Sequence, residues 1–513
     1  MSETVMSSAG DRVAELRRKY GNWWPTRRAT LGGLTLPGWA VFIGAILATM
    51  FMFMLGVWQL GLLVLLLAVL FELLFVVRFG DRASGQTVAE RFGVAWSFAG
   101  RVHRGEARFN TGLFSNLPAD QQTPLPGVLS RLEEFSGTDG HGRPFTLLYH
   151  PEPRVLTAVF ECNPDGRALQ SQHSVDGGVG WYAEWLSSLS ADPAIVGGTA
   201  TDDSALTSSA PLVARKEAEI DPGAPEVAQL ATRQGARALP GRHAEISVWV
   251  TVSWSVTALA DSLEDAVTEV AARLPVHIDA LRQAGGGLVT PATSEMLARA
   301  VRIAYNPARA AEYAADLTRG HRDGLKVTQA GPEYFDDSVG RVCLHDGVAS
   351  MTALVLAPPR QRITEQRFET LFAPTDRFLR KRVTVFYRPL SFGKSQRMVE
   401  AMSDQAELLQ SAKRRPRHDD KRRVDHARKA EAEIGDRGAA MVHFGMAVTV
   451  TFDVDRRSYR EAELQLKTLL ERSSVTYRFC DADAGPAFHA TLPLGMLPWQ
   501  YETAVERYLG GAA

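Results

Sequence analysis

The feature that most constrains this chain is an apolar run from Leu36 to Val77. Only Thr49, Gln59 and Glu72 are clearly polar within it, and the run contains no Lys, Arg or Asp. About 20 apolar residues cross a bilayer as a helix, so the run is long enough to cross twice. One straight helix of this length would extend roughly 60 Å, about twice the hydrocarbon thickness. We therefore predict a transmembrane hairpin over residues 36–78, with helices at about 38–55 and 60–77.

Two alternatives to a membrane hairpin are a signal peptide and a buried core hairpin of a soluble protein. A signal peptide begins near the N-terminus and has a shorter apolar core, whereas residues 1–35 precede this run. Basic residues flank both ends of the run, and such residues remain in the cytoplasm. We therefore predict a multi-pass protein of the inner (plasma) membrane that contacts membrane lipids, with both termini cytoplasmic. The flanking basic residues are Arg17, Arg18, Lys19, Arg27, Arg28, Arg78, Arg82 and Arg91.

Individual residues near the run have predicted roles. Trp23, Trp24 and Trp39 suit the aromatic belt at the headgroup level, and Arg78 follows the second helix. These four are predicted membrane anchors. Glu72 lies inside the second helix, where an ionisable group is costly and marks a functional position by default. We predict that Glu72 contacts a partner.

Composition limits the class of protein. The net charge of −1 and the charged fraction of 22% exclude a chain that binds nucleic acid through its overall charge, although local basic patches remain possible. The three cysteines lie far apart without a CxxC motif, which argues against a zinc site and a disulfide framework. The 513 residues leave room for two or three domains besides the hairpin.

Apolar periodicity predicts an α+β fold for the rest of the chain. Ile246–Trp254 alternates as a strand and precedes a helix at about 259–283. A similar order recurs at residues 446–479, and His489–Leu492 reads as a short final strand. Strands with one buried face favour mixed or antiparallel sheets with helices packed on one side. The predicted regions are a basic cytoplasmic tail (1–35), the hairpin (36–78), a first α+β region (79–190), a loop-rich connection (191–243) and a second α+β region (244–513). Within the loop-rich connection, Val213–Ile220 and Pro225–Arg233 could be helical.

A tripeptide suggests phosphate binding but lacks the required context. Gly393-Lys394-Ser395 follows a strand and precedes a helix, where a phosphate-binding loop would lie. Such a loop needs a glycine five residues before the second one, and Arg388 occupies that position. We predict that the chain is not an autonomous ATPase.

A basic segment is the best candidate for partner contact. His418-Asp419 and Asp425-His426 suggest a metal-dependent phosphohydrolase, but residues 413–429 carry nine Lys or Arg and only three Asp. Clustered cations repel a divalent metal. A solvated charged helix remains the plainer alternative, and the partner could be DNA, lipid or protein. The predicted contact residues are Arg414, Arg415, Arg422 and Arg423; we predict no catalytic, cofactor-binding or metal-binding residue and no cofactor.

Short stretches along most of the chain carry a family resemblance. They are Tyr20-Gly21-Asn22-Trp23, Gly80-Asp81-Arg82 with Glu90-Arg91, Leu125-Pro126-Gly127-Val128-Leu129, Gly142-Arg143-Pro144-Phe145-Thr146-Leu147-Leu148-Tyr149-His150-Pro151 and Pro164-Asp165-Gly166. Together they resemble a family of actinobacterial integral membrane proteins associated with conjugation and type IV secretion-like clusters.

A second resemblance concerns the C-terminal half. It rests on the Arg382–Pro389 strand, the helix ending near Gly435, the Met446–Asp453 strand and Leu492-Pro493-Leu494-Gly495. This half resembles the amino-terminal, non-nucleotide-binding part of a VirB/TrbE-type secretion ATPase. In that family the motor domain follows, whereas this chain stops at Ala513.

The resemblance implies a non-enzymatic scaffold of a conjugation or type IV secretion-like apparatus. Such a scaffold docks a separate ATPase and self-associates, and nucleic acid is a weaker candidate partner. One alternative is a type VII secretion membrane component, which would have a similar layout. Another is a membrane-tethered enzyme that acts on nucleotide or nucleic acid through the region of Lys394 or His418.

Overall fold

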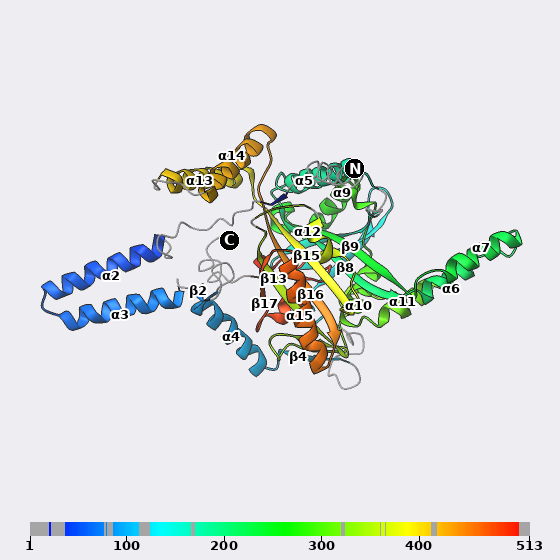
Figure 1. The fold of residues 1–513 in the computed structure, drawn as a ribbon, viewed down its shortest axis with the longest axis horizontal. Coiled ribbons are helices and arrows are strands. Elements are labelled where there is room, and N and C mark those ends of the chain that lie inside the picture. Colours follow the sequence, from blue (N-terminus) through cyan, green and yellow to red (C-terminus); the bar gives the residue numbers. More distant parts are fainter. Residues whose placement is uncertain are drawn as a thin grey trace, which may run out of the picture.

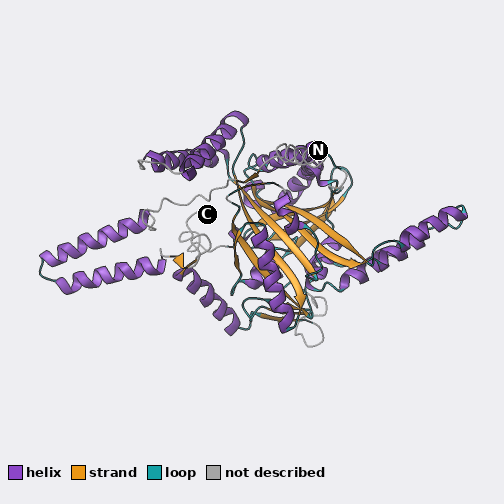
Figure 2. Ribbon diagram, viewed as in Figure 1, coloured by secondary structure: helices purple, strands orange, loops and turns teal. Residues whose placement is uncertain are grey.

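A 13-stranded sheet forms the centre of the described chain (Figure 2). The structure, a computed structural model, describes residues 20–21, 36–75, 78–79, 86–111, 124–164, 166, 170–319, 324–359, 361–364, 366–411 and 418–501. Its named strands pair only in antiparallel fashion. This confirms the predicted α+β class with an antiparallel sheet.

The first unit of the sheet has a split βαβ topology. Four of its strands lie in the order β10-β7-β9-β8, while helix α5 connects β7 to β8 and α9 connects β9 to β10. This is the ferredoxin-like arrangement, and β6 and β5 extend it beyond β7. The elements are β5 (Glu133–Thr138), β6 (Pro144–His150), β7 (Val155–Asn163), α5 (Gln172–Ser188), β8 (Ile195–Ser208), β9 (Arg242–Ser255), α9 (Leu263–Leu281) and β10 (Leu288–Pro291).

The second unit repeats this order. Its strands lie in the order β17-β13-β16-β15, with α12 between β13 and β15 and α15 between β16 and β17. Strands β12 and β11 extend it beyond β13, as β6 and β5 extend the first unit. The elements are β11 (Tyr334–Asp336), β12 (Cys343–His345), β13 (Val348–Ala357), α12 (Gln366–Phe372), β15 (Arg380–Pro389), β16 (Val442–Asp453), α15 (Arg456–Arg472) and β17 (Thr476–Phe479).

The two units join through equivalent strands. Strand β8 pairs with β15 from Gly198 opposite Tyr387 to Ser204 opposite Lys381. Because each unit contributes the same strand to an antiparallel pair, the junction has the geometry of an isologous, two-fold contact. The sheet therefore continues without a break from β5 at one edge to β4 (Arg108–Asn110) at the other.

Each unit carries a pair of helices at the same position, between its second and third core strands. In the first unit these are α6 (Ala210–Ala218) and α7 (Glu226–Arg237), and in the second they are α13 (Phe392–Ser411) and α14 (His418–Arg437). Because β8 and β15 are antiparallel, the two helix pairs leave the sheet in opposite directions (Figure 1). We call them the first arm and the second arm.

One face of the sheet is apolar and covered by the connecting helices. In the first unit, Val250 and Val252 of β9 share a buried cluster with Leu274 of α9. In the second, Val448 of β16 shares a cluster with Leu466 of α15. Since side chains alternate across a strand, the other face receives the intervening residues.

The other face has a line of buried hydroxyl groups across both units, which we call the hydroxyl band. Neighbouring strands exchange hydrogen bonds within it, such as Thr199 with Thr251 at 2.8 Å and Thr201 with Thr384 at 3.0 Å across the junction. A hydrogen-bonded hydroxyl can be buried without the large cost of an unpaired one. The band consists of Thr157, Thr199, Thr201, Thr251, Ser253, Ser350, Thr352, Thr384, Thr449 and Thr451.

A C-terminal segment of residues 484–501, the strap, lies against the hydroxyl band. It begins with α16 (Ala484–Ala490) and ends with η5 (Pro498–Gln500). The Thr384 hydroxyl of β15 donates to the Thr491 carbonyl at 3.3 Å, and His150 of β6 lies 2.9 Å from the Leu494 carbonyl. The strap therefore bonds to both units. Its apolar side chains share one buried cluster with α10 (Ser294–Tyr305).

Gly495 makes the closest approach of the strap to the sheet, and Gly495→Ala is expected to lower the free energy of unfolding. Gly495 has φ of +68°, and a Cβ there would overlap the side chain of Thr157. A left-handed non-glycine residue costs about 1–3 kcal/mol, and overpacking about 1–3 kcal/mol more. Urea denaturation should therefore show a loss of about 2–6 kcal/mol.

The control for this variant is Gly142→Ala. Gly142 also has a left-handed φ, of +75°, but no atom lies within 4 Å of its Cβ position. It isolates backbone strain from overlap with the sheet. Equal losses in the two variants would contradict the close packing of the strap.

The N-terminal apolar run forms a helical hairpin of α2 (Leu36–Met54) and α3 (Trp58–Phe75). The Thr49 hydroxyl donates to the Ala45 carbonyl at 2.7 Å and lies 3.1 Å from the Gly61 carbonyl. The hydroxyl of Thr49 is therefore hydrogen-bonded within the hairpin. Many of its apolar side chains are exposed. Across the described residues, however, no helix combines the length and the apolar character needed to cross a membrane. The predicted transmembrane assignment of the hairpin and the multi-pass inner-membrane localisation with cytoplasmic termini are therefore wrong.

Three other sequence predictions also need correction. Residues 191–243, predicted as a loop-rich connection, contain β8 and the whole first arm. His489–Leu492, predicted as a strand, overlaps the end of α16. Helices were predicted on one side of the sheet, yet α10 and α16 contribute to the core on the side of the hydroxyl band.

The remaining elements flank the two units. They are β1 (Tyr20–Gly21), β2 (Arg78–Phe79), β3 (Gln86–Thr87), α4 (Val88–His103), η2 (Gly127–Arg131), α8 (Val256–Leu259), η3 (Arg282–Gly286), α11 (Arg309–Thr318), η4 (Val327–Gln329) and β14 (Arg362–Ile363). The predicted basic tail, residues 1–35, lies outside the described residues except for β1, which pairs with β14.

Candidate functional site

The second arm rises from a hydrogen-bonded neck. The Leu390 N–H donates to the Met441 carbonyl at 2.9 Å, so the two ends of the arm lie side by side. The buried Ser395 hydroxyl accepts the Met441 N–H at 3.0 Å and donates to the Ser391 carbonyl at 3.1 Å. These contacts fix the start of α13 against the start of β16.

Beyond its neck, the described part of the second arm has a small core of its own. Ala406 of α13 and Val424 and Ala427 of α14 form a buried cluster. Arg428 forms an ion pair with Glu407 at 3.7 Å across the two helices. Both of these side chains are exposed, so the pair contributes little to stability. Most of the described surface of the arm is therefore available to a partner.

Basic residues gather on one side of α14. With 3.6 residues per turn, Lys421 and Lys429 lie away from the buried Val424 and Ala427, whereas Arg428 lies closer to Val424 and pairs with Glu407 of α13. All three are exposed. Asp425 lies between Lys421 and Lys429 on this outward side, so the side carries a small net positive charge over residues 421–429.

The first arm differs in charge from the second. Arg215 and Lys216 both pair with Glu219, at 2.8 and 3.0 Å. Arg237 pairs with Glu217 at 3.5 Å. The four Lys or Arg of residues 209–241 are balanced by four Asp or Glu. The two arms therefore occupy equivalent positions in the fold but present different surfaces.

The tripeptide Gly393-Lys394-Ser395 lies within α13. The Ser395 N–H donates to the Ser391 carbonyl at 2.9 Å, so it is not available to a phosphate. The Ser395 hydroxyl is occupied by the neck contacts, and Lys394 is exposed. The geometry thus favours a structural role for Ser395.

The histidines of the second arm do not gather carboxylates. His426 is half-buried in α14, and burial lowers its pKa. Within the described residues, no group of three or more His, Cys, Asp or Glu side chains has a geometry that could hold a metal ion. The side chains of His418 and Asp419 lie outside the described part.

Most predicted contact and anchor residues cannot be placed by their side chains. Arg422 lies on α14 with a half-buried side chain. Trp23, Trp24, Arg414 and Arg415 lie outside the described residues. For Trp39 (α2), Glu72 (α3), Arg78 (β2) and Arg423 (α14), the backbone is described but the side chain is not.

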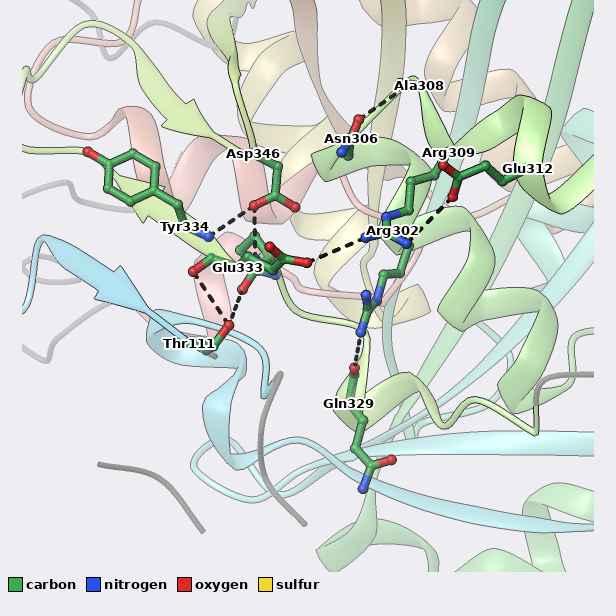
Figure 3. Close-up of polar contacts among 11 residues, drawn as sticks. Thr111, Arg302, Asn306, Ala308, Arg309, Glu312, Gln329, Glu333, Tyr334 and Asp346 are labelled. Carbon is green, nitrogen blue, oxygen red and sulfur yellow. Dashed lines mark hydrogen bonds and ion pairs between the residues drawn. The ribbon is translucent and has the colours of Figure 1, made fainter. Parts of the chain in front are cut away.

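A polar network at the far end of the sheet was not predicted from the sequence (Figure 3). Asp346 accepts the N–H groups of Glu333 and Tyr334, each at 2.9 Å. Arg309 pairs with Glu333 at 3.4 Å, and Thr111 donates to the Pro332 carbonyl at 3.1 Å. The network joins the β11–β12 hairpin to α11 and to the end of β4. Its groups satisfy one another, which indicates a structural role.

A second unpredicted feature is a set of buried charges at the β8–β15 junction. Arg380 pairs with Asp203 at 2.7 Å, and both side chains are 5% exposed. Glu245 lies 3.7 Å from Arg380. Burial alone would lower the pKa of Arg380, but the carboxylates of Asp203 and Glu245 raise it above its usual value.

The neighbouring residues of the junction carry charges on the opposite face. Burial lowers the pKa of Lys381 to about 8, an effect that Asp202 partly opposes. Burial likewise raises the pKa of Asp202 to about 7 against the effect of Lys381. The Lys381 ammonium donates to the Ala373 carbonyl. The junction thus carries buried charges on both faces of the sheet.

No protein-family model and no curated protein matches this chain.

Proposed function

We propose that this protein is a non-enzymatic scaffold of a conjugation or type IV secretion-like apparatus that docks a separate ATPase. The apparatus is suggested by the sequence resemblance. The observation that carries the docking role is the second arm, which extends from the sheet (Figure 1) and bears the exposed basic residues Lys421, Arg428 and Lys429 on α14.

The partner surface is proposed to be acidic. Lys421 and Lys429 are exposed, and Arg428 has only an exposed carboxylate at 3.7 Å as its partner. Charge complementarity raises association rates and selects among partners. An ATPase bound at the second arm would not contact the hydroxyl-band face of the sheet, because the strap and α10 cover that face.

The test is to remove each arm separately. Residues 392–439 would be replaced by an Asn-Gly turn, which suits a two-residue hairpin, because the neck already joins Leu390 to Met441. The matched control replaces residues 210–240 in the same way, since the Ser209 N–H donates to the Gly241 carbonyl at 3.1 Å. Proteins that co-purify with each variant from gently solubilised cells would be identified.

We expect the full chain and the variant without the first arm to recover a protein with intact nucleoside-triphosphatase motifs. The variant without the second arm should not recover it. Recovery by all three proteins would contradict docking at the second arm. Recovery that disappears after nuclease treatment would indicate nucleic acid as the partner instead.

A charge reversal gives a finer prediction. The double variant Lys421→Glu and Lys429→Glu is expected to weaken ATPase binding about tenfold or more at low salt, because it inverts two exposed charges of the docking face. The control is Lys216→Glu with Arg233→Glu on the first arm, which should leave binding unchanged. A pull-down titration at 50 and 300 mM salt measures both. Equal binding by the two double variants would contradict the proposal.

A further inference from the structure

Three polar side chains surround Phe488 of the strap, where β15, the strap and α10 pack together. The guanidinium carbon of Arg382 (β15) lies 4.7 Å from the centre of the Phe488 ring. The ring of Tyr305, at the end of α10, lies 5.3 Å from Phe488 and 6.2 Å from the ring of His489. One residue of the second unit, one of the strap and one of α10 therefore meet at this point.

The polar atoms of this group lack partners. No hydrogen bond is made by the three guanidinium nitrogens of Arg382, by the Tyr305 hydroxyl or by His489 Nε2. Arg382 and Tyr305 are each less than 2% exposed, and His489 is 3% exposed. Buried polar groups in folded proteins nearly always have a partner, either protein, water or an ion.

The charge of Arg382 also lacks a counter-ion. The carboxylate whose charge raises the pKa of Arg382 is Asp203, and Asp203 already pairs with Arg380 at 2.7 Å. No ion pair of Arg382 occurs within 4.0 Å among the described residues. Burial lowers the pKa of Arg382 to about 10, so the group remains a cation at neutral pH. An uncompensated buried ion costs several kcal/mol.

We propose that Arg382, Tyr305 and His489 hold a small inorganic anion of chloride size between β15, α10 and the strap. An anion accepts hydrogen bonds from the guanidinium, from the Tyr305 hydroxyl and from His489 in the tautomer with a proton on Nε2. It also neutralises the Arg382 charge, which a water molecule cannot do. The dense aromatic surroundings of Phe488, Phe335 and His345 favour a monatomic ion over a larger oxyanion.

The anion would link three parts of the fold. It would join β15 to α10 and to the strap, and so fix the strap on the second unit. Its effect on the protein is therefore measurable as stability that depends on the identity of the anion.

The experiment compares thermal unfolding of the full chain in sodium chloride and in sodium gluconate at equal ionic strength. Gluconate is too large for the site. We expect the Tm to be higher by about 2–4 °C in 300 mM chloride, because a ligand that binds only the folded state stabilises it by mass action. An equal Tm in the two salts would overturn the proposal in favour of internal water.

Two variants separate the anion from general salt effects. Tyr305→Phe keeps the ring and removes one donor, so the chloride concentration for half of the Tm rise should increase about tenfold. Tyr477→Phe, whose hydroxyl bonds the exposed Glu471 at 3.4 Å, is the control and should behave as the unaltered protein. An unchanged chloride response in Tyr305→Phe would also overturn the proposal. Bromide diffraction should place one anomalous peak beside Arg382.

Discussion

Lowering the pH from 7 to 5 is expected to reduce the free energy of unfolding by about 5 kcal/mol. Burial is the main cause, because it lowers the pKa of four histidines. The pKa falls to about 4 for His150 and His277 and to about 3 for His345 and His489. Hydrogen bonds fit the neutral forms: the Ser350 hydroxyl lies 2.8 Å from His345 Nε2, and the Tyr501 hydroxyl lies 2.9 Å from His150 Nδ1.

The sign follows from the protons bound in each state. Between the ordinary histidine pKa of about 6.5 and the folded values, the unfolded chain binds more protons, so stability falls as the pH falls. Each histidine contributes about 2 kcal/mol of this loss at pH 5. Asp202 acts in the opposite direction, because its raised pKa of about 7 lets the folded state bind a proton first. It offsets about 3 kcal/mol of the loss.

Urea denaturation at pH 7, 6 and 5 measures this effect. The variant His150→Gln keeps a donor toward the Leu494 carbonyl and removes one titrating group, so it should lose less stability on acidification by about 2 kcal/mol. His141→Gln, at an exposed position of the β5–β6 turn, is the control and should show the full loss. A free energy of unfolding that is constant from pH 7 to 5 would show that these histidines are not held neutral.

Asp203→Ala is expected to lower the free energy of unfolding by about 3–5 kcal/mol at pH 7. The change removes the carboxylate that lies 2.7 Å from Arg380. Arg380 then retains Glu245, at 3.7 Å, as its ion-pair partner. Arg382 loses the favourable electrostatic effect of the Asp203 carboxylate. Removing one partner of a buried pair leaves an uncompensated ion, which is why the loss exceeds the value of the pair itself.

The matched control for Asp203→Ala is Asp481→Ala. Asp481 pairs with Arg341 at 3.0 Å, but its side chain is 65% exposed. A pair of this kind contributes about 0–1 kcal/mol. Urea denaturation of both variants should therefore separate them by at least about 2 kcal/mol. Similar losses would mean that Arg380 reaches solvent when its partner is removed.

Much of the fold was predictable because its elements have regular apolar spacing. The strand predicted at Ile246–Trp254 corresponds to β9. The helix predicted at about 259–283 corresponds to α9. In each case one face is buried against a continuous core, so the period is visible in the residues alone.

Strand β8 was missed for a physical reason. Strand β8 contains Gly197-Gly198-Thr199-Ala200-Thr201 and two aspartates, a composition typical of loops. Its polar residues are buried because they bond across the sheet, as Thr201 does with Thr384. Gly197 is small because Trp499 and Leu497 of the strap lie against it. These partners are distant in the chain, so no local pattern reveals them.

The candidate sites were predicted only in part. The basic character of the second arm is visible in residues 413–429, because the charges are consecutive. The group of Arg382, Tyr305 and His489 draws its members from three separate segments. A signal was nonetheless present: Arg380-Lys381-Arg382 places cations on both faces of an otherwise apolar strand.

The pairing of β8 with β15 determines how the protein would bear tension. Each arm continues from the C-terminal end of one of these strands, and the strands run in opposite directions. A pull on both arms therefore loads the junction in shear, parallel to the strands and across the hydrogen bonds between them. All the bonds from Gly198–Tyr387 to Ser204–Lys381 must then yield together, whereas peeling would break them one at a time. A pull on the two arms is therefore resisted along the whole β8–β15 junction.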